Sequence, residues 1–363
     1  MKTAAQVTSA KLRGGFYTPA RLVDHTLARL RPLVSPTASL RVLEPGVGDG
    51  AFIEGLARNS FNVDRTLALD IDEDAVRNSR EALARHDIAG HVLSQSMLTW
   101  SLQNNDEFDL VVGNLPFVRF QFVPIADRIA ANRHAERLNV AIGGVSNLWL
   151  PMLLASLTRL RVDGAFALIL PAECFTGTSA GSARKWLLEN TDKLRCDLYP
   201  PGSYPDVLQE VVVLSGLRSR RSTVAKRKIL FALHGAQYSA KDFADSDALL
   251  TCHLIDAGGE AWTKLLLAKQ QLSAYEEALS LTTTTRLSTL AKFEVAAVTG
   301  ANAFFSLRAS DVQRYNLEKW ARPLLVRSNQ VPGLNFTQDD FDHNISNDRM
   351  TYLFDSSIAD IGP

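Results

Sequence analysis

The sequence predicts an α/β protein: a doubly wound, Rossmann-like parallel sheet followed by a smaller C-terminal module. Between about residues 19 and 215, strand-like and helix-like segments alternate along the chain, which is the pattern of a sheet covered by helices. The strand-like segments are short and mostly apolar, as expected of strands buried on both sides. With 363 residues, 46% of them hydrophobic, the chain is long enough for one large or two medium domains.

The first expected helix begins near Pro19, a residue that suits the first turn of a helix. Its apolar positions follow helical spacing at Leu22, Val23, Leu27 and Leu30. Further helices are expected over residues 51–59, 73–86, 146–160 and 183–190. Strands are expected over residues 40–45, 65–72, 90–97, 108–114, 164–172 and 209–218.

The alternation of strand-like and helix-like segments ends after residue 218. A basic, polar stretch covers residues 218–228, and an amphipathic helix is expected within residues 260–280. We therefore predict a main domain over residues 1–220, a connector with a helix over 221–286, and a second module over 287–363. The second module is irregular in pattern, and it is expected to be incomplete because its last residues form no closing element.

Composition limits the classes of function. Lys+Arg and Asp+Glu both total 39, so nucleic-acid binding would require a local basic face rather than bulk charge. The three cysteines, Cys174, Cys196 and Cys252, form no CxxC pair, which argues against a disulfide framework or a zinc site. No apolar stretch is long enough to span a bilayer, and no signal peptide is recognisable. We expect a cytoplasmic protein with no membrane segment and no bound metal.

A glycine-rich turn follows the first expected strand, in "VLEPGVGDGAF" (42–52). Gly46, Gly48 and Gly50 would let the backbone turn tightly and approach a ligand at a helix N-terminus. Asp70 ends the next expected strand, which adjoins this turn in a doubly wound sheet, and its carboxylate could accept hydrogen bonds from both hydroxyls of a ribose. On spacing alone, these residues fit a dinucleotide or S-adenosylmethionine.

The residues around the turn distinguish the two ligands. A dinucleotide fingerprint has its third glycine three residues after the second, whereas the spacing here is G-x-G-x-G. Glu44 and Pro45 precede the turn. A carboxylate there would repel a pyrophosphate, but it suits the cationic sulfonium and ammonium groups of S-adenosylmethionine. The turn therefore favours the methyl donor.

The tetrapeptide "NLPF" (114–117) ends a later strand, and the same crevice should face its carboxyl end. The amide oxygen of Asn114 and the carbonyl of Leu115 are two acceptors, which suit the two N–H donors of an exocyclic amino group. Phe117 offers a flat face on which a base can stack, and Pro116 would stiffen the turn. We predict that this tetrapeptide binds and orients an amino-bearing ring.

Together these motifs resemble those of the N6-adenine DNA methyltransferases, in the subgroup whose cofactor motifs precede the catalytic motif. Methylase parts of some restriction–modification enzymes belong to it. The resemblance extends over nearly the whole chain. It implies that residues 1–220 bind S-adenosylmethionine and carry the catalytic site. It also implies that residues 287–363 begin a target-recognition region, because "VTGANAFFSL" (298–307) resembles a sequence often found there.

The resemblance implies roles for residues that spacing does not single out. Thr18, in "GGFYTP" (14–19), would contact the methionine end of the donor, and Ile71 would lie beside the donor's adenine. Ser96 and Met97 align where the amino group of that adenine is expected to bind. The family carries an acid at the position of Ser96, and a serine oxygen accepts a weaker hydrogen bond than a carboxylate.

The expected activity is methyl transfer from S-adenosylmethionine to the N6 amino group of adenine in double-stranded DNA. The target base would leave the duplex and stack between Phe117 and Tyr204, which lies in a segment (203–214) resembling the family's late motif. A restriction endonuclease or a further specificity region is the expected protein partner.

Two alternatives stay open. Leu115 replaces the first proline of the family's usual Asn-Pro-Pro-Tyr or Asn-Pro-Pro-Phe. Leucine still supplies the backbone carbonyl, but leucine or isoleucine is common there in rRNA adenine dimethylases, so an RNA adenine-N6 methyltransferase is the first alternative. A non-catalytic module that binds DNA or the donor is the second, favoured by Ser96 and by the unfinished C-terminal region.

Overall fold

The computed structural model describes residues 18–142, 147–177, 180–200, 210–235, 248–285, 287–292 and 301–357. The chain divides into two compact units, Met1–Ala278 and Leu279–Pro363. Tyr204, residues 14–17 and residues 298–300, to which the sequence analysis gives roles, lie outside the described residues.

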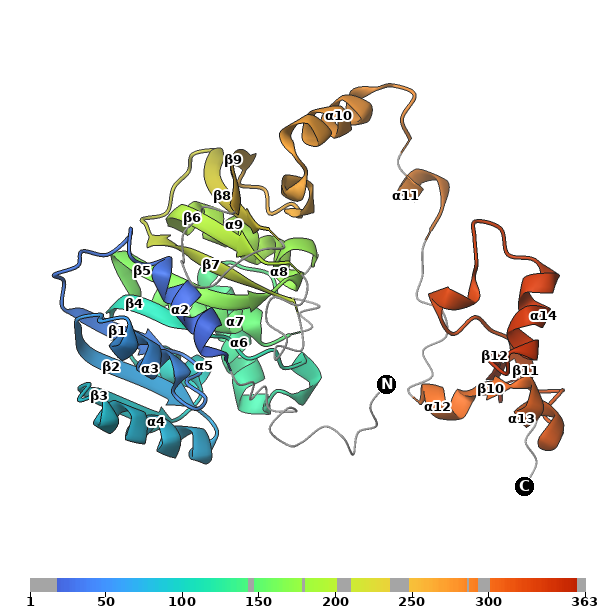
Figure 1. The fold of residues 1–363 in the computed structure, drawn as a ribbon, viewed down its shortest axis with the longest axis horizontal. Coiled ribbons are helices and arrows are strands. Elements are labelled where there is room, and N and C mark those ends of the chain that lie inside the picture. The colour runs from blue at the N-terminus through green and yellow to red at the C-terminus, as the bar shows by residue number, and fades with distance from the viewer. Residues whose placement is uncertain are drawn as a thin grey trace. The chain divides into compact units, whose positions relative to one another are not determined.

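The first unit is built on a nine-stranded sheet with the order β3-β2-β1-β4-β5-β7-β6-β8-β9 (Figure 1). Pairing is parallel from β3 to β5 and between β6 and β8, while β7 and β9 run antiparallel to their neighbours. The strands are β1 (Leu40–Glu44), β2 (Val63–Asp70), β3 (Gly90–Ser94), β4 (Phe108–Asn114), β5 (Leu160–Pro171), β6 (Thr191–Leu198), β7 (Val211–Arg218), β8 (Lys226–His234) and β9 (Ala248–Asp256).

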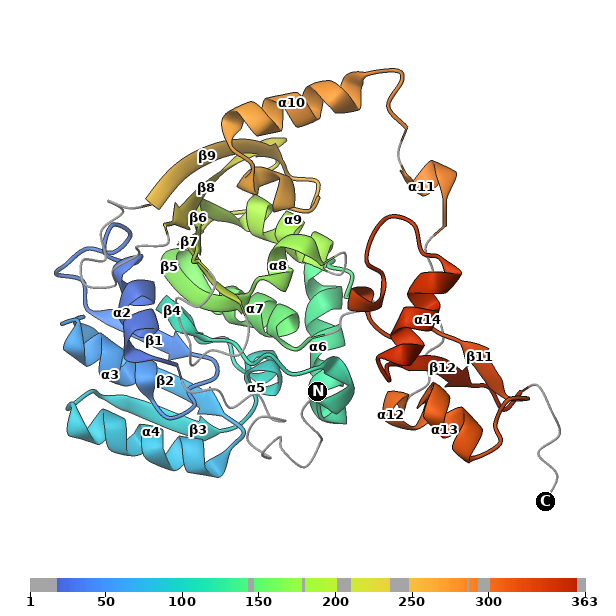
Figure 2. The same cartoon turned by 45° about the vertical axis from the view of Figure 1, so that its right-hand side comes forward.

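Helices cover both faces of this sheet, which confirms the predicted doubly wound α/β fold. Figure 2 shows α2, α3 and α4 on one side of the strands and α5, α6 and α7 on the other. Successive residues of one strand join different cores: Leu110 packs with α2 and α3, whereas Val111 packs with α5 and α7. The helices are α2 (Ala20–Ala28), α3 (Ala51–Arg58), α4 (Glu73–Arg85), α5 (Met97–Gln103), α6 (Ile125–Leu138), α7 (Trp149–Thr158), α8 (Glu173–Thr176) and α9 (Gly181–Asn190).

The sheet extends into the residues that the sequence analysis assigns to a connector. Strands β8 and β9 lie within the range 221–286, and the break between the two units falls at Ala278 rather than at residue 286. The basic start of β8 conceals the strand in the sequence: Lys226 and Lys228 are exposed, while Ile229 and Phe231 are buried in the main core. The expected helix within 260–280 is α10 (Lys269–Ser280), preceded by a 3-10 turn, η5 (Thr263–Leu266).

The second unit is small and contains a three-stranded antiparallel sheet in the order β10-β12-β11. Its described core includes polar side chains: the amide of Asn344 donates to the carbonyl of Gln330, and the amide of Gln330 donates to the carbonyl of Met350. These polar residues explain why its sequence pattern looks irregular. Its elements are α11 (Leu287–Leu290), α12 (Asn302–Phe305), β10 (Ser306–Arg308), α13 (Ala309–Arg314), β11 (Ala321–Pro323), η6 (Ser328–Gln330), α14 (Gln338–Ser346) and β12 (Met350–Phe354).

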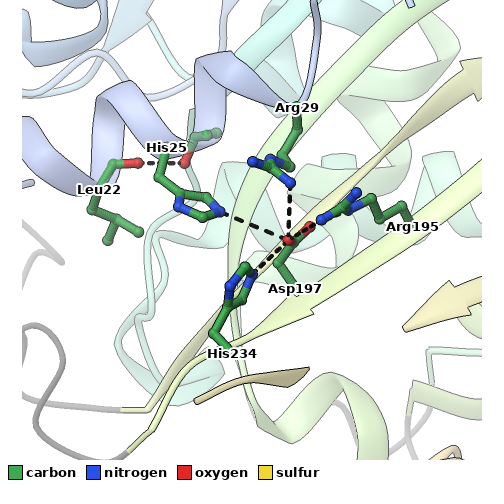
Figure 3. A network of polar contacts seen from close by, with 7 residues as sticks. Leu22, His25, Arg29, Arg195, Asp197 and His234 are labelled. Carbon is green, nitrogen blue, oxygen red and sulfur yellow. Dashed lines mark hydrogen bonds and ion pairs between the residues drawn. The ribbon is translucent and has the colours of Figure 1, made fainter. Parts of the chain in front are cut away.

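A buried ionic network, here called the Asp197 network, ties α2 to the far half of the sheet (Figure 3). Asp197 on β6 is fully buried. Its carboxylate accepts hydrogen bonds from Arg195 at 2.7 and 2.9 Å and lies 2.8 Å from the Nε2 atom of His234. From α2 and its C-terminal end, His25 approaches the same carboxylate at 3.7 Å and Arg29 at 3.5 Å.

The negative charge of Asp197 is compensated within the network. Burial would raise the pKa of Asp197, but hydrogen bonds from His234 and Arg195, the nearby His25 ring and the charge of Arg195 lower it well below its usual range. Burial lowers the pKa of His25 to about 4. The ligand atoms of His25, Asp197 and His234 lie within 4.8 Å of one another, yet the two guanidinium groups beside them would repel a metal cation. The role of the network is therefore structural: it holds α2 against β6 and β8.

Two further features bear on the sequence-based expectations. The three cysteines are free thiols, with Cys174 and Cys196 buried and Cys252 exposed. Among the described residues, no helix combines the length and the apolar character needed to cross a membrane.

Candidate active site

A cavity of about 470 Å³ opens where β1, β2 and β4 end. Glu44 ends β1, Asp70 ends β2 and Asn114 ends β4, and all three line the cavity. Strand order reverses between β1 and β4, so this is the position at which doubly wound sheets bind ligands. The other sequence-predicted residues that line it are Thr18, Pro45, Gly46, Gly48, Ile71, Ser96, Met97, Leu115 and Pro116.

Residues of the glycine turn line this cavity. The backbone conformation favours glycine at two positions of the turn. Gly48 has φ +54° and Gly50 has φ +87°, both in the left-handed region that favours glycine. A Cβ atom on Gly50 would also lie only 3.2 Å from the Cβ of Ala82. The turn is held by the Ser79 hydroxyl, which donates to the carbonyl of Gly48 at 2.9 Å.

Asp70 supports the turn from β2. One carboxylate oxygen accepts the N–H of Gly48 at 2.9 Å, and the other accepts the N–H of Asp72 at 2.9 Å. Each oxygen keeps a further lone pair, so Asp70 holds the turn and still has acceptor capacity toward the cavity. Ile71 beside it is 48% exposed, which leaves an apolar side chain at the rim. The predicted ribose and adenine contacts of these two residues stay predictions.

Glu44 is a buried carboxylate without compensation. Its side chain is 1% exposed, and its Oε2 atom has no hydrogen-bond partner within the described part of the chain. Burial, followed by the negative charges of Asp49 and Asp70, raises the pKa of Glu44 well above its usual range. A cation entering the cavity would relieve this unfavourable environment.

Asn114 is oriented by Thr18. Its Nδ2 atom donates to the Thr18 hydroxyl at 3.1 Å, and its Oδ1 atom is buried without a hydrogen-bond partner in the described residues. Using the amide N–H in this bond leaves the amide oxygen as the group that faces an incoming donor. Thr18 itself is 6% exposed, so one side chain lines the cavity and positions the amide.

The rest of the tetrapeptide divides between cavity and core. Leu115 is 1% exposed, and its N–H donates to the carbonyl of Ile169 at 3.3 Å, which fixes its peptide unit against β5. Pro116 lines the cavity. Phe117 is not among the residues that line it. It is half-buried and packs against both cores of the sheet, so its predicted stacking role stays a prediction.

Several residues that line the cavity could not be predicted from the sequence, and Asp127 is the buried acid among them. Asp127, in the first turn of α6, lines the cavity and is 6% exposed. Burial raises its pKa, and a hydrogen bond with the Ser96 side chain lowers it. No motif or spacing points to this aspartate, because its place in the cavity depends on how α6 packs against α5.

Comparison with known proteins identifies the family. The sequence profile named N-6 DNA Methylase matches residues 1–242. The chain belongs to this family. Its C-terminal part, residues 259–361, matches the C-terminal domain of the Type II methyltransferase M.Eco57I.

Two curated proteins are similar in sequence. The Type II methyltransferase M.AccI of Acinetobacter calcoaceticus is 22% identical over 328 residues, which cover 87% of this chain and 57% of that protein. A tRNA1(Val) (adenine(37)-N6)-methyltransferase of Bacteroides thetaiotaomicron is 30% identical over 138 residues, which cover 37% of this chain and 52% of that protein. The chain therefore spans little more than half the length of these relatives.

Solved structures share the fold. The DrdV–DNA complex matches with a TM-score of 0.59 and 13% identity, over 86% of this chain and 38% of that one. A Listeria monocytogenes structure assigned to the class I S-adenosylmethionine-dependent methyltransferases matches with a TM-score of 0.51 and 14% identity, over 63% of this chain and 68% of that one. The predicted α/β fold of S-adenosylmethionine-dependent methyltransferases is thereby confirmed.

Proposed function

We propose that this chain transfers the methyl group of S-adenosylmethionine to the N6 amino group of adenine in DNA, as the methylase of a restriction–modification system. The proposal rests on two buried oxygen atoms at neighbouring strand ends, Oε2 of Glu44 and Oδ1 of Asn114, which have no hydrogen-bond partner among the residues that the structure describes. Buried polar atoms normally have partners. An unpartnered carboxylate suits a cation, and an unpartnered amide oxygen suits an N–H donor.

The cavity fits the proposed methyl donor. S-adenosylmethionine, when bound, supplies a methyl group on a cationic sulfonium, together with a cationic ammonium. Glu44 would provide the opposite charge, the backbone of the Gly46–Gly50 turn would pack closely against the donor, and Asp70 would accept from its ribose. Family membership and the fold of the structural neighbours support the same cofactor.

Asn114 and Leu115 would act on the target amino group. The lone pair of an adenine amino group is delocalised into the ring, which makes the nitrogen a poor nucleophile. The Asn114 amide oxygen and the Leu115 carbonyl, each accepting one N–H, would favour a tetrahedral nitrogen whose lone pair points at the methyl group. Positioning of this kind contributes most when the groups are already oriented, and the hydrogen bond from Asn114 to Thr18 supplies that orientation.

DNA is the proposed macromolecular substrate. The Type II methyltransferase matches cover both units of the chain, since M.AccI is aligned over 328 residues and the M.Eco57I C-terminal domain matches residues 259–361. We infer that the second unit takes part in recognising the DNA target, and that a restriction endonuclease or a further specificity region completes the system. RNA methylation is the second candidate, supported by Leu115 and by the similarity to the tRNA methyltransferase.

A transfer assay tests the proposal. The chain is incubated with donor carrying a labelled methyl group and with unmethylated duplex DNA of mixed sequence, structured RNA, or no nucleic acid. Label is expected in DNA. Replacement of Asn114 by Ala should lower transfer by about 100-fold or more while the dissociation constant of the donor changes little. Asn105→Ala, at an exposed asparagine before β4, is the control and should keep full transfer. Label in RNA alone would select the second candidate.

A further inference from the structure

The cavity lacks an acid at the position where the family carries one, and the structure shows what the residue there does instead. Ser96 precedes α5 as its N-cap, and its hydroxyl oxygen accepts the N–H of Leu98 at 3.2 Å. This bond satisfies an N–H at the start of the helix. The Ser96 side chain also lies close enough to the carboxylate of Asp127 to lower the pKa of that acid.

Asp127 brings a carboxylate to this place from another element. It lies in the first turn of α6 and lines the same cavity as Ser96, Met97 and Ile71. The side chain is 6% exposed, so one of its faces borders the cavity while the rest is enclosed by protein. A carboxylate has acceptor sites for about four hydrogen bonds, so the contact with Ser96 leaves Asp127 with acceptor capacity for a ligand.

A buried contact fixes the position of α6 relative to α5. His134, two turns further along α6, has its Nε2 atom 2.8 Å from the Ser101 hydroxyl and 3.1 Å from the carbonyl of Leu98, both on α5. All three residues are buried. Because the two helices are joined there, the first turn of α6 is held with Asp127 beside the start of α5. The carboxylate is therefore placed by the fold rather than by a mobile loop.

The electrostatic surroundings of Asp127 differ from those of an ordinary ion-paired acid. Burial raises its pKa, the Ser96 bond lowers it, and no lysine or arginine contributes to the shift. A helix N-terminus favours an acid in its first turn, which accounts for an aspartate at this position. It does not account for a buried aspartate that faces a ligand cavity.

We propose that Asp127 accepts a hydrogen bond from the 6-amino group of the donor's adenine, and so performs the role of the acid that Ser96 replaces. This inference rests on the proposed function, because it requires S-adenosylmethionine in the cavity. Ser96 then acts as a positioning residue, since its hydroxyl aims the carboxylate. Ile71 supplies the apolar surface beside the same ring. A carboxylate at this point would attract an amino group and repel a carbonyl oxygen, so the site would select adenine over a 6-oxopurine.

The test compares S-adenosylmethionine with its 6-oxo analogue, in which a carbonyl replaces the adenine amino group. Dissociation constants are measured by isothermal titration calorimetry for the full chain and for Asp127→Asn, the double variant Ser96→Asp/Asp127→Asn, and Asp74→Asn. Asp74 is a matched control because it lines the same cavity but is exposed and paired with Arg77. Thermal unfolding of each variant reports whether it folds.

The wild-type chain should prefer the amino donor by about tenfold or more, as expected when a polar contact becomes repulsive. Asp127→Asn should bind the two donors within about threefold of each other, since an amide can both accept and donate. The double variant should restore the preference, because it returns a carboxylate to position 96. Asp74→Asn should keep the wild-type preference, because Asp74 is exposed to solvent and already paired with Arg77.

Equal dissociation constants for the two donors in the wild-type chain would show that Asp127 does not have this role, and that measurement does not depend on any variant. An unchanged preference in a folded Asp127→Asn variant would show the same. Neither result would contradict the proposed methyltransferase activity, for which Glu44→Gln should weaken the binding of both donors to the same extent. If the wild-type chain binds neither donor, the proposed function itself is wrong and the assignment of Asp127 is wrong with it.

Discussion

Two carboxylates are buried near the ends of strands in the same sheet, and their surroundings are opposite. Asp197 on β6 is met by Arg195, Arg29, His25 and His234, and its pKa lies well below its usual range. Glu44 on β1 has one oxygen without a partner in the described residues and has acids as its charged neighbours, and its pKa lies well above its usual range. Burial is nearly complete at both.

The difference separates a structural charge from a functional one. The Asp197 carboxylate is satisfied by protein groups, so the network joins α2 to the sheet without any ligand. Glu44 destabilises the folded chain when ionised, and only a ligand of opposite charge would reverse that effect. A buried polar group that the protein leaves unsatisfied is therefore a better indication of a binding site than a buried group that it satisfies.

The largest effect is expected from neutralising the satisfied carboxylate. Asp197→Asn leaves the buried Arg29 and the half-buried Arg195 beside an amide, and it should lower the free energy of unfolding by about 3–5 kcal/mol. Urea titration measures this change. Asp192→Asn, on the same strand, is the control: its pairing with Arg227 is exposed on the acid side, and exposed pairs contribute about 1 kcal/mol or less. If the free energy of unfolding fell by a similar amount in both variants, the buried network would contribute no more to stability than an exposed ion pair.

A pH titration of stability examines the same network through His25. Burial lowers its folded-state pKa to about 4, whereas an unfolded histidine titrates near 6.5. The unfolded chain therefore binds more protons between these values, and stability is lost as pH falls from about 6.5 to 4, by about 3 kcal/mol. His25→Gln should flatten that part of the profile. An identical slope in wild type and variant would show that His25 is not the group responsible.

The effect of pH on stability through Glu44 should be opposite in direction to the effect through His25. Because its folded-state pKa is raised, Glu44 takes up protons on folding, and stability falls as pH rises from its unfolded value through its folded value. Glu44→Gln removes this loss and should stabilise the ligand-free chain at neutral pH by about 1–2 kcal/mol. The same change should weaken donor binding by about tenfold or more. Calorimetry of unfolding and of binding measures both.

Glu54→Gln is the control for that experiment. Glu54 lies on the adjacent α3, is half-exposed and pairs with Arg85, so its replacement should change neither quantity by much. If Glu44→Gln lowered the free energy of unfolding and left the dissociation constant of the donor unchanged, the proposed difference between Glu44 and Asp197 would be wrong.

The smallest effect is expected from removing the contact that orients the amide oxygen of Asn114. Thr18→Val removes the acceptor that holds the Asn114 amide, so the amide oxygen would lose its fixed direction and the transfer rate should fall by about tenfold. Thr18→Ser keeps the hydroxyl and should keep the rate. Single-turnover transfer kinetics compare the two variants, and equal rates in both would mean that the hydroxyl does not orient the amide.

The contrast also marks where sequence patterns stop being informative. The glycine turn, Asp70 and Asn114 could be predicted, because each sits at a strand end within a short, recognisable pattern. The positions of Asp127 and His25 could not, since each depends on the packing of a helix against elements distant in the chain. Strand β8 was concealed by the lysines on its exposed face. The assignment of residues 287–363 to target recognition stays a prediction.

We propose that Asn114 and Glu44 border one methyl-transfer site that acts on the amino group of adenine. The most direct measurement is the identity of the product. Unmethylated duplex DNA is incubated with the chain and with donor carrying a deuterated methyl group, digested to nucleosides, and analysed by mass spectrometry. Deuterated N6-methyladenine is expected with the wild-type chain, and none above background with Asn114→Ala. Label on cytosine, or equal N6-methyladenine from both proteins, would contradict it.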